Sequence, residues 1–426
     1  MDKPFLSVRR NRIAAALDLK AELLLIGAGQ PIPLPENTDQ TYPFRSHTEY
    51  FYLMGYECAG GVLAFDPKDG PDAWVSFVPE VTEAEKTWEG REQIEGTPIA
   101  ALESWLTTRR GRPLVLLGEP IRGVYTDPAL IGSAREKFRH ARRAKDVAEI
   151  DALHRAAQAT AAGFAALEQV IRPGITERQL QVALETGFFR AGADHTGYGT
   201  IVGTGSNSAV LHFKPSNRAT VTGDLLLVDA GAEVDRYVID VTRTYLVGDN
   251  PDPFQRDLYQ IVLAAEETGI AGCVIDAEWK ELHLQVATQM VDDLVQVGLM
   301  RGSAESLVEQ GAHQLFFPHG LGHLVGLGVR DASGNLPGRP KDERPALGNL
   351  RMDLPLAENY VTTVEPGLYF IPPILNDPQR RDRFKDCVNW ELVERNYHLG
   401  GIRIEDNVIV TTNGPVNLTK EIPKRL

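Results

Sequence analysis

Cysteine is scarce in this sequence, with only three among 426 residues. Cys58, Cys273 and Cys387 lie far apart, are odd in number and form no Cys-X-X-Cys pair. A disulfide framework and a thiolate metal site are therefore excluded, because both require paired or closely spaced cysteines. We expect all three to act as small hydrophobic residues of the interior.

Long apolar stretches are also missing. No run approaches the roughly 20 residues that a membrane-spanning helix needs. The N-terminus, Met1-Asp2-Lys3-Pro4, lacks the apolar core of a secretory signal. These absences predict a soluble protein of the reducing cytoplasm, without a membrane partner.

An excess of basic residues is the third absence. Lys and Arg number 44 against 58 Asp and Glu, which gives a net charge of −14. Nucleic acids and anionic membrane surfaces bind basic faces, so both are excluded as partners. The acidic excess either keeps the chain soluble or gathers carboxylates around metal, and composition does not separate these two explanations.

The chain does have the length and apolar content for two domains. Domains usually span roughly 100 to 200 residues, and 43% of this chain is hydrophobic. Up to about residue 145, apolar runs alternate with helical patterns and predict one α/β unit. Its strands are expected at 21–27, 60–65, 73–78 and 113–117, with a short helix at 100–108. A basic stretch then leads into a long helix, and we place the boundary there, giving domains 1–145 and 146–426.

The second domain is predicted to mix long helices with short strands, so the fold class is α/β with α+β character. Its first helix, 146–171, ends at Arg172-Pro-Gly, and the Thr176…Gln179 capping box opens the next, to residue 190. Strands are expected at 225–229 and 237–247, and helices at 253–269 and 278–297. Residues 330–349 are rich in glycine, proline and charge, and are predicted to form a mobile loop.

Two aspartates stand on the predicted pair of strands. Asp229 interrupts an apolar run, and a turn centred between Val234 and Asp235 would place it opposite Asp240, with Cβ atoms roughly 4.5–5.5 Å apart. Facing carboxylates repel unless a proton or a cation lies between them. The alternative is a turn-flanking acid and an unrelated surface acid.

The two faces of the second strand differ in character. Thr242 and Thr244 share the face of Asp240 and are placed to hydrogen-bond carboxylates there. The opposite face carries Tyr237, Ile239 and Val241, which suit packing. This alternation favours a polar site on one side of the hairpin.

Two histidines, His319 and His323, are separated by Gly-Leu-Gly. The glycines disfavour a regular helix, so this is not the HExxH pattern of zinc proteases. Glycine instead allows the backbone to approach a ligand closely. One imidazole can bind metal while the other donates to substrate, whereas the alternative is a pair of ordinary loop histidines.

Two glutamates follow β-branched or apolar runs. Glu365 ends Val361-Thr-Thr-Val, where burial demands a partner for its carboxylate. Glu405 lies two residues after Arg403 and shares its strand face, which indicates either a site or a structural ion pair. Four acids and one histidine, each at the end of an apolar run, together indicate a metal site more strongly than any one of these segments does alone.

This donor set predicts its metal chemistry. Oxygen ligands with one imidazole suit Mn²⁺, Co²⁺, Zn²⁺ or Fe²⁺. Four carboxylates balance two divalent ions, and two ions roughly 3.5–4 Å apart can activate a bridging water for hydrolysis.

The same residues resemble a known family, the creatinase/aminopeptidase or "pita-bread" metallopeptidases (M24B). The likeness rests on Val228-Asp-Ala-Gly, Asp240-Val-Thr-Arg-Thr, His319-Gly-Leu-Gly-His, Val364-Glu-Pro-Gly-Leu-Tyr-Phe and Gly401-Ile-Arg-Ile-Glu-Asp. It covers 150–426 strongly. The segment 41–55 is similar, more weakly, to the N-terminal creatinase-like domain of prolidases and aminopeptidases P, which argues against a methionine aminopeptidase.

The resemblance implies roles for individual residues. It implies a metal site in which Asp229 binds one ion, Asp240 and Glu405 bridge both, and His323 and Glu365 complete the second. It also implies that Glu365 carries a proton and that His319 and His212 contact substrate. Arg403 would organise the site. The candidate substrate contacts are Arg351, Arg403, Tyr237 and Arg330.

Two arginines bear on the substrate. Arg351 lies fourteen residues before Glu365 and resembles the arginine with which prolidases grip a dipeptide carboxylate, for which a guanidinium is well shaped. Its alternative is a solvated arginine beside Asp353. Arg330 departs from the family, which usually has a histidine there, so the implied substrate contacts are less firm than the metal ligands.

The expected activity is that of a Xaa-Pro dipeptidase (prolidase), in which a metal-bridging hydroxide attacks the carbonyl before proline. The alternative is a Xaa-Pro aminopeptidase (aminopeptidase P) acting on longer peptides. A non-catalytic binding protein on the same fold is a further alternative, although such relatives usually lose metal ligands. We expect two divalent ions, Mn²⁺ with Co²⁺ or Zn²⁺ as substitutes, a proline-containing dipeptide as substrate, and a homodimer.

Overall fold

The computed structural model describes residues 4–36 and 39–426, and the chain divides into two units. The first unit ends at Arg142 and the second begins at Arg143, where the sequence placed the boundary before residue 146. Each unit has its own sheets and its own apolar core. None of the described helices combines the length and the apolar character that crossing a bilayer requires.

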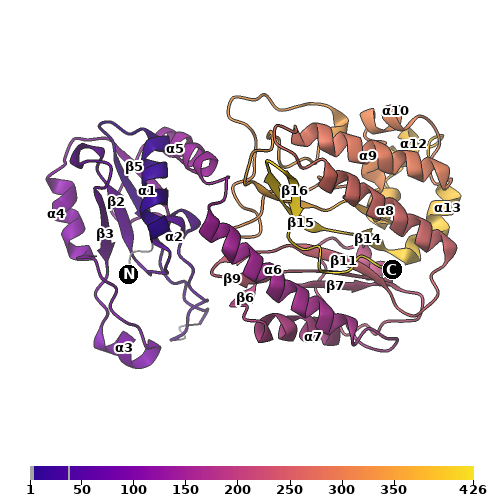
Figure 1. The fold of residues 1–426 in the computed structure, drawn as a ribbon, viewed down its shortest axis with the longest axis horizontal. Helices are drawn as coiled ribbons and strands as arrows, with labels where there is room; N and C mark the ends of the chain where they lie inside the picture. The colour runs from indigo at the N-terminus through magenta and orange to yellow at the C-terminus, as the bar shows by residue number, and fades with distance from the viewer. Residues whose placement is uncertain (1–3, 37–38) are drawn as a thin grey trace. The chain divides into compact units, whose positions relative to one another are not determined.

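A mixed five-stranded sheet forms the centre of the first unit, in the order β4-β3-β2-β1-β5. Figure 1 labels β2, β3 and β5 of this sheet. β1 runs parallel to β5 and antiparallel to β2. All residues of β1 and β2 are buried, as their uninterrupted apolar sequences predict. The strands are β1 (Leu23–Gly27), β2 (Val62–Phe65), β3 (Trp74–Val78), β4 (Thr97–Pro98) and β5 (Leu114–Gly118).

Within the described part of this unit, five α-helices accompany the sheet. The predicted short helix is α4, whereas α1 and α5 are long helices that the sequence analysis did not predict. Thr82 and Glu85 form a capping box at the start of α3. The helices are α1 (Pro4–Leu17), α2 (Thr48–Met54), α3 (Glu83–Glu89), α4 (Leu102–Thr107) and α5 (Pro128–Ala141).

In the second unit, short strands lie between the helix pair α6–α7 and the helix pair α8–α9 (Figure 1). The predicted capping box at Thr176 opens α7, and the structure shows a second one, Asp146 with Glu149, at the start of α6. The longer helices are α6 (Val147–Glu168), α7 (Glu177–Arg190), α8 (Pro253–Ala271) and α9 (Trp279–Gln296). Shorter ones are α10 (Ala304–Glu309), α11 (Pro372–Leu375), α12 (Pro378–Arg383) and α13 (Trp390–Arg395).

The strands of the second unit form several small sheets, ordered β10-β9-β6, β11-β8-β7, β12-β15-β16 and β13-β14. Two isolated bridges, Thr242 with Glu405 and Leu324 with Thr362, connect segments that are distant in sequence. The strands are β6 (His195–Thr196), β7 (Ile201–Thr204), β8 (Leu225–Ala230), β9 (Ala232–Val234), β10 (Tyr237–Val238), β11 (Val241–Leu246), β12 (Val361–Val364), β13 (Gly367–Tyr369), β14 (Gly401–Arg403), β15 (Asp406–Thr411) and β16 (Gly414–Asn417).

The hairpin that carries the two aspartates has a different register from the predicted one. Asp229 pairs with Thr242, and Tyr237 pairs with Val234. The turn therefore consists of Asp235 and Arg236, whose φ angles are +51° and +73°. Two left-handed residues make the tight turn that matches the twist of a hairpin. The prediction was wrong by two residues, and because side chains alternate with period two, the aspartates still share one face.

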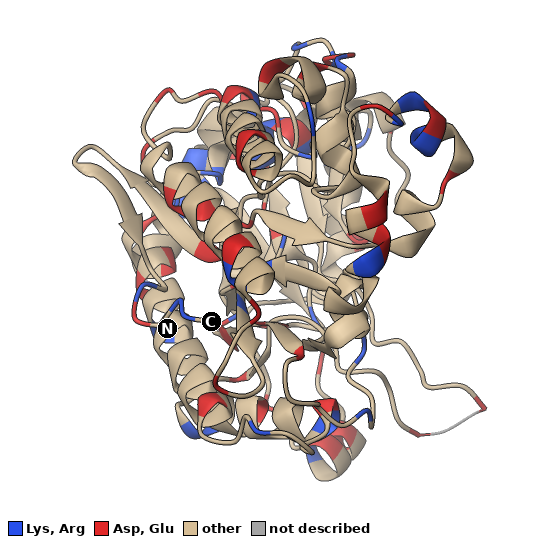
Figure 2. Ribbon diagram, turned by 90° about the vertical axis from the view of Figure 1, so that its right-hand side faces the viewer, with Lys and Arg blue, Asp and Glu red and all other residues tan. Residues whose placement is uncertain are grey.

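The predicted mobile loop, 330–349, is irregular apart from one turn, η5 (Pro345–Leu347), and ion pairs hold it against the body of the second unit. Arg339 donates to Glu278 at 2.6 and 2.9 Å and to Asp353 at 2.6 Å. Asp353 is therefore the partner of Arg339. In the view of Figure 2, basic and acidic residues are interspersed along the ribbon.

Candidate metal centre

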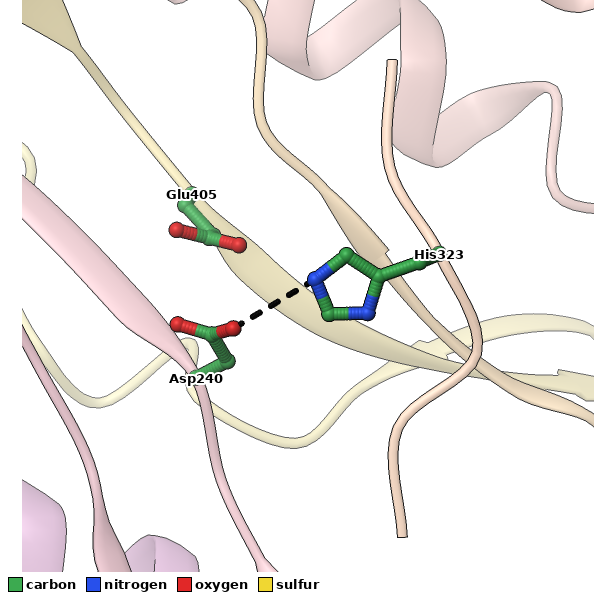
Figure 3. Close-up of side chains that lie close together, drawn as sticks. All are labelled: Asp240, His323 and Glu405. Carbon is green, nitrogen blue, oxygen red and sulfur yellow. Dashed lines mark ion pairs between the residues drawn. The ribbon is translucent and has the colours of Figure 1, made fainter. Parts of the chain in front are cut away.

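Three side chains from distant parts of the second unit converge on one point. Asp240, His323 and Glu405 each offer a ligand atom, and these atoms all lie within 4.8 Å of one another (Figure 3). Asp240 lies between β10 and β11, His323 precedes β12, and Glu405 lies between β14 and β15. All three are buried.

The backbone around His323 fixes its imidazole. The Nδ1 atom lies 3.1 Å from the Leu324 carbonyl oxygen, so Nδ1 carries the proton and Nε2 is left as the ligand atom. The Nε2 atom lies 3.5 Å from Asp240 Oδ2 and 3.8 Å from Glu365 Oε1. Gly322 permits this approach, because a Cβ there would lie 2.1 Å from the Thr363 carbonyl oxygen.

Asp229 joins the cluster through a shared tyrosine. The Tyr198 hydroxyl lies 2.6 Å from Asp229 Oδ1 and 2.5 Å from Asp240 Oδ1. Arg403 donates from Nη2 to the other oxygen of Asp229 at 2.5 Å. Burial and the surrounding carboxylates raise the pKa of Tyr198 well above its usual value, so the phenol stays a proton donor.

A hydrogen bond from the aspartate-bearing hairpin fixes the carboxylate of Glu405. Thr242 donates from Oγ1 to Glu405 Oε2 at 2.7 Å, while Thr244 bonds the backbone of Arg403. Both predicted threonines therefore act at this site, but on the segment of Glu405 rather than on the aspartates of their own hairpin. The hairpin itself needs Gly231, because a Cβ at that position would lie 1.6 Å from the Ile239 carbonyl oxygen.

A second chain of contacts runs from Arg403 to Glu365. Arg403 donates from Nη1 to the Tyr369 hydroxyl at 2.7 Å, and that hydroxyl lies 2.9 Å from His319 Nε2. The Nδ1 atom of His319 lies 2.9 Å from the Gly320 carbonyl oxygen and 3.8 Å from Glu365 Oε2. Burial, aided by the charge of Arg403, lowers the pKa of His319 to about 3, so the ring is neutral.

The carboxylates of this centre are not balanced by the chain's own cations. Burial and the neighbouring acids raise the pKa of Glu405 well above its usual value and that of Glu365 to about 7. Burial also raises the pKa of Asp229, against the opposing charge of Arg403. Divalent cations would remove this repulsion, and the oxygen-rich set with one imidazole suits first-row divalent metals.

Four other predicted residues lie apart from this cluster. His212 follows a 3-10 turn and is exposed, not placed on an apolar strand. Arg330 is exposed, yet its charge helps to lower the pKa of His319. Arg351 is exposed and makes no ion pair or hydrogen bond with the described residues. Tyr237 is buried, and its hydroxyl donates to Glu149 at 3.1 Å.

Sequence reasoning missed Tyr198 and gave no role to Tyr369. Tyr198 stands in Gly197-Tyr-Gly199, and glycines flanking an aromatic residue signal a close backbone approach. Tyr369 belongs to the family motif that begins at Val364, and its strand β13 pairs with β14, which carries Arg403. Both now belong to the candidate site because they hold its charged groups in place.

Comparisons with known proteins show the family of this chain. Residues 151–412 match metallopeptidase family M24, and residues 7–96 match the aminopeptidase P N-terminal domain. A protein of Paracoccidioides lutzii, named a probable Xaa-Pro aminopeptidase, is 30% identical over 92% of this chain and 88% of its own. One of Ajellomyces capsulatus with the same name is 30% identical over 93% and 90%.

Solved structures are similar over nearly the whole chain. An Escherichia coli aminopeptidase P in complex with substrate has a TM-score of 0.79 at 27% identity, covering 98% of this chain and 96% of its own. Aminopeptidase PepP of Pseudomonas aeruginosa has a TM-score of 0.79 at 26% identity, covering 100% and 97%. The fold is thus an aminopeptidase P N-terminal domain followed by a pita-bread domain, and this chain belongs to the M24 metallopeptidases.

Proposed function

We propose that this chain is a metal-dependent Xaa-Pro aminopeptidase, which removes the first residue of peptides whose second residue is proline. The proposal is carried by the convergence of Asp240, His323 and Glu405 within 4.8 Å. It is supported by relatives of that name that align over about nine-tenths of both chains. Support for this alternative is stronger than for the dipeptidase that Arg351 suggested.

The proposed metal ligands are Asp229, Asp240, His323, Glu365 and Glu405. Manganese is our first choice of metal, with cobalt or zinc as substitutes, and an Escherichia coli aminopeptidase P has been solved in a zinc-substituted form with product. Two divalent ions held there would supply an activated water and stabilise negative charge on the substrate carbonyl.

The chain's own residues would orient the substrate and move the proton. Glu365, with 18% of its side chain exposed, is placed to carry a proton toward the leaving nitrogen of proline. The neutral His319 has a single N–H, which now donates to the Gly320 carbonyl, so it can donate to the substrate if it gives up that bond. Arg403 keeps Tyr369 and Asp229 in place.

The experiment compares peptides that differ only beyond proline. Protein loaded with Mn²⁺ is expected to cleave Ala-Pro-Ala with a kcat/KM well above that for Ala-Pro, and to leave N-acetyl-Ala-Pro-Ala intact. An Asp240→Asn variant is the matched control for contaminating peptidase. If neither peptide is cleaved although metal is bound stoichiometrically, the proposal fails and the non-catalytic alternative takes its place.

Arg351 separates the two peptidase activities. Under our proposal, Arg351→Ala leaves KM for both Ala-Pro-Ala and Ala-Pro within about threefold of wild type, because the arginine is exposed and holds no carboxylate. A KM for Ala-Pro alone that rises tenfold or more would restore the dipeptidase assignment. The homodimer and the cytoplasmic location stay predictions, and sedimentation of the purified protein tests the first.

A further inference from the structure

The segment that follows His323 ties together two strands of the candidate centre. Leu324 bridges Thr362 of β12, three residues before Glu365. Two residues further on, the Gly326 carbonyl oxygen accepts a hydrogen bond of 2.8 Å from the backbone N–H of Val238 in β10. The path of residues 324–332 therefore sets where His323 lies between the segments of Asp240 and Glu365.

A fully buried ion pair lies beneath this segment. Lys145 Nζ is 2.8 Å from Asp331 Oδ2, and neither side chain has any exposed surface. Asp331 closes the segment on itself, because its backbone N–H donates to the Leu324 carbonyl at 2.9 Å and its Oδ2 accepts from the Leu327 N–H at 3.2 Å. A Cβ at Gly326 would lie 2.5 Å from Lys145 Cε, so the contact is tight.

Arg143 reinforces the same attachment. Its Nε donates to the Ala332 carbonyl oxygen at 2.9 Å, and the guanidinium is buried. Ala332 has a φ of +47°, a conformation that a residue with a side chain rarely adopts. Backbone in such a conformation persists only where its surroundings hold it, and here Arg143 and Lys145 do so from the start of the second unit.

The energetics of burial argue against a purely stabilising role for this pair. Removing two charges from water costs several kcal/mol per ion, and hydrophobic replacements of buried pairs are often neutral or stabilising. The best-attested use of such a pair is to select one arrangement among several. The arrangement selected here is the path of residues 324–332, which begins at a candidate metal ligand.

We propose that Lys145 is a positioning residue for the metal centre: its buried contact with Asp331 fixes residues 324–332, and through them His323 Nε2, at the distance from Asp240 and Glu365 that a divalent cation requires. The proposal rests on the metal centre of the proposed function. Under this proposal Lys145, at the start of the second unit, strengthens metal binding although it is not itself a metal ligand.

The test removes both charges of this ion pair together. In Lys145→Met/Asp331→Asn the amide oxygen can still accept from Leu327, so the fold is kept. Isothermal titration of the chelator-stripped full chain with Mn²⁺ is expected to give a dissociation constant at least about tenfold above wild type, within the range that changing outer partners of metal ligands produces. The melting temperature of the metal-free protein should stay within about 5 °C of wild type.

The matched control is a largely buried ion pair of the first unit. Arg112 Nη1 lies 2.6 Å from Asp66 Oδ2, and Arg112→Met/Asp66→Asn should leave the Mn²⁺ dissociation constant within twofold of wild type. An unchanged constant in Lys145→Met/Asp331→Asn, or an equal rise in the control, overturns the proposal.

A second variant keeps the test decisive if the neutral pair does not fold. Lys145→Arg retains the charge but replaces a compact ammonium by a planar guanidinium that does not fit against Gly326. We expect the Mn²⁺ dissociation constant to rise by at least about fivefold, and an unchanged constant contradicts positioning. If wild-type protein binds no Mn²⁺, the proposed function itself fails, which separates that failure from this one.

Discussion

Glu405 and Asp406 are neighbours in the chain and are both buried carboxylates, yet their surroundings are opposite. Asp406 lies 2.6 Å from an Arg243 nitrogen and 2.5 Å from Lys424 Nζ. Glu405 receives one hydrogen bond from Thr242, and its nearest cation, Arg403, lies 4.0 Å away. The pKa values follow these surroundings.

Burial would raise the pKa of both groups. At Asp406 the charges of Arg243 and Lys424 outweigh burial and lower the pKa well below its usual value. At Glu405 the carboxylates of Asp240 and Glu365 add to burial and raise it. The chain thus supplies its own cations beside Asp406, and leaves the charge unbalanced at Glu405, where we propose that metal ions bind.

Removing the charge of Asp406, the carboxylate that the chain's own cations neutralise, should have the largest effect on stability. Asp406→Asn leaves the buried Arg243 and the partly buried Lys424 without their shared anion, and we expect a loss of about 3 kcal/mol in the free energy of unfolding. Urea denaturation of the metal-free protein measures it. A loss below about 1 kcal/mol would mean that Glu266, which also pairs with Lys424, replaces the missing carboxylate.

Removing the charge of Glu405, which the chain does not neutralise, should lower activity and leave stability unchanged. Glu405→Gln removes one proposed metal ligand, so kcat/KM on Ala-Pro-Ala should fall at least about a hundredfold. In the metal-free protein the raised pKa of Glu405 favours its protonated form, which Gln resembles, so the metal-free variant should be no less stable than wild type. If Glu405→Gln destabilises the metal-free chain as much as Asp406→Asn does, the contrast between the two neighbours is wrong.

Metal removal and re-addition test the protonation state of Glu365 and Glu405 directly. Without cations, Glu365 has a pKa of about 7 and that of Glu405 is raised, so the stripped site holds protons at neutral pH that metal must displace. Titration with Mn²⁺ at pH 7 in buffers of different ionisation enthalpy should therefore show proton release. Each Mn²⁺ ion that binds at a hundred times its dissociation constant should also add about 2.7 kcal/mol to the free energy of unfolding.

Two buried histidines, which belong to neither side of this comparison, provide a last test. His283 and His313 have ring centroids 5.9 Å apart, and their Nδ1 atoms lack hydrogen-bond partners among the described residues. Burial lowers the pKa of His283 to about 4 and that of His313 to about 3. Below about pH 6.5 the unfolded chain takes up protons that the folded chain excludes, so stability should fall from pH 6.5 toward pH 4.

The expected slope is about 1.4 kcal/mol per pH unit for each histidine. Melting curves of wild type and of His283→Gln/His313→Gln between pH 7 and 5 measure it, and the double variant should show the flatter dependence. Replacing the exposed His154 by Gln should leave the slope unchanged. Equal slopes in wild type and the double variant would show that these rings are not excluded from water.

Local patterns predicted much of this molecule because their physics is local. The apolar runs of β1 and β2 and the capping box of α7 depend on residues close in sequence, and each element formed near its predicted place. Alternation also placed Asp229 and Asp240 on one face. The register could not be predicted in the same way, because Asp235-Arg236 carries no glycine or asparagine to mark a left-handed turn.

Long-range contacts left little trace in the sequence. Tyr198 bonds a carboxylate 31 residues further on, and Lys145 pairs with Asp331 across 186 positions. Nothing near either residue marks these partners. The five proposed metal ligands could be grouped from their residue types and their positions at the ends of apolar runs, but only the family resemblance implied which ion each would bind. The helices α11, α12 and α13 are too short to show a helical period.

The lack of space around Gly231 affects how homologous sequences should be interpreted. Since a single extra carbon there would collide with the Ile239 carbonyl, every substitution at this codon must reshape the ribbon that presents both aspartates. A homologous sequence that keeps all the acids but carries an alanine at this point should therefore be regarded as an inactivated copy before any assay is run.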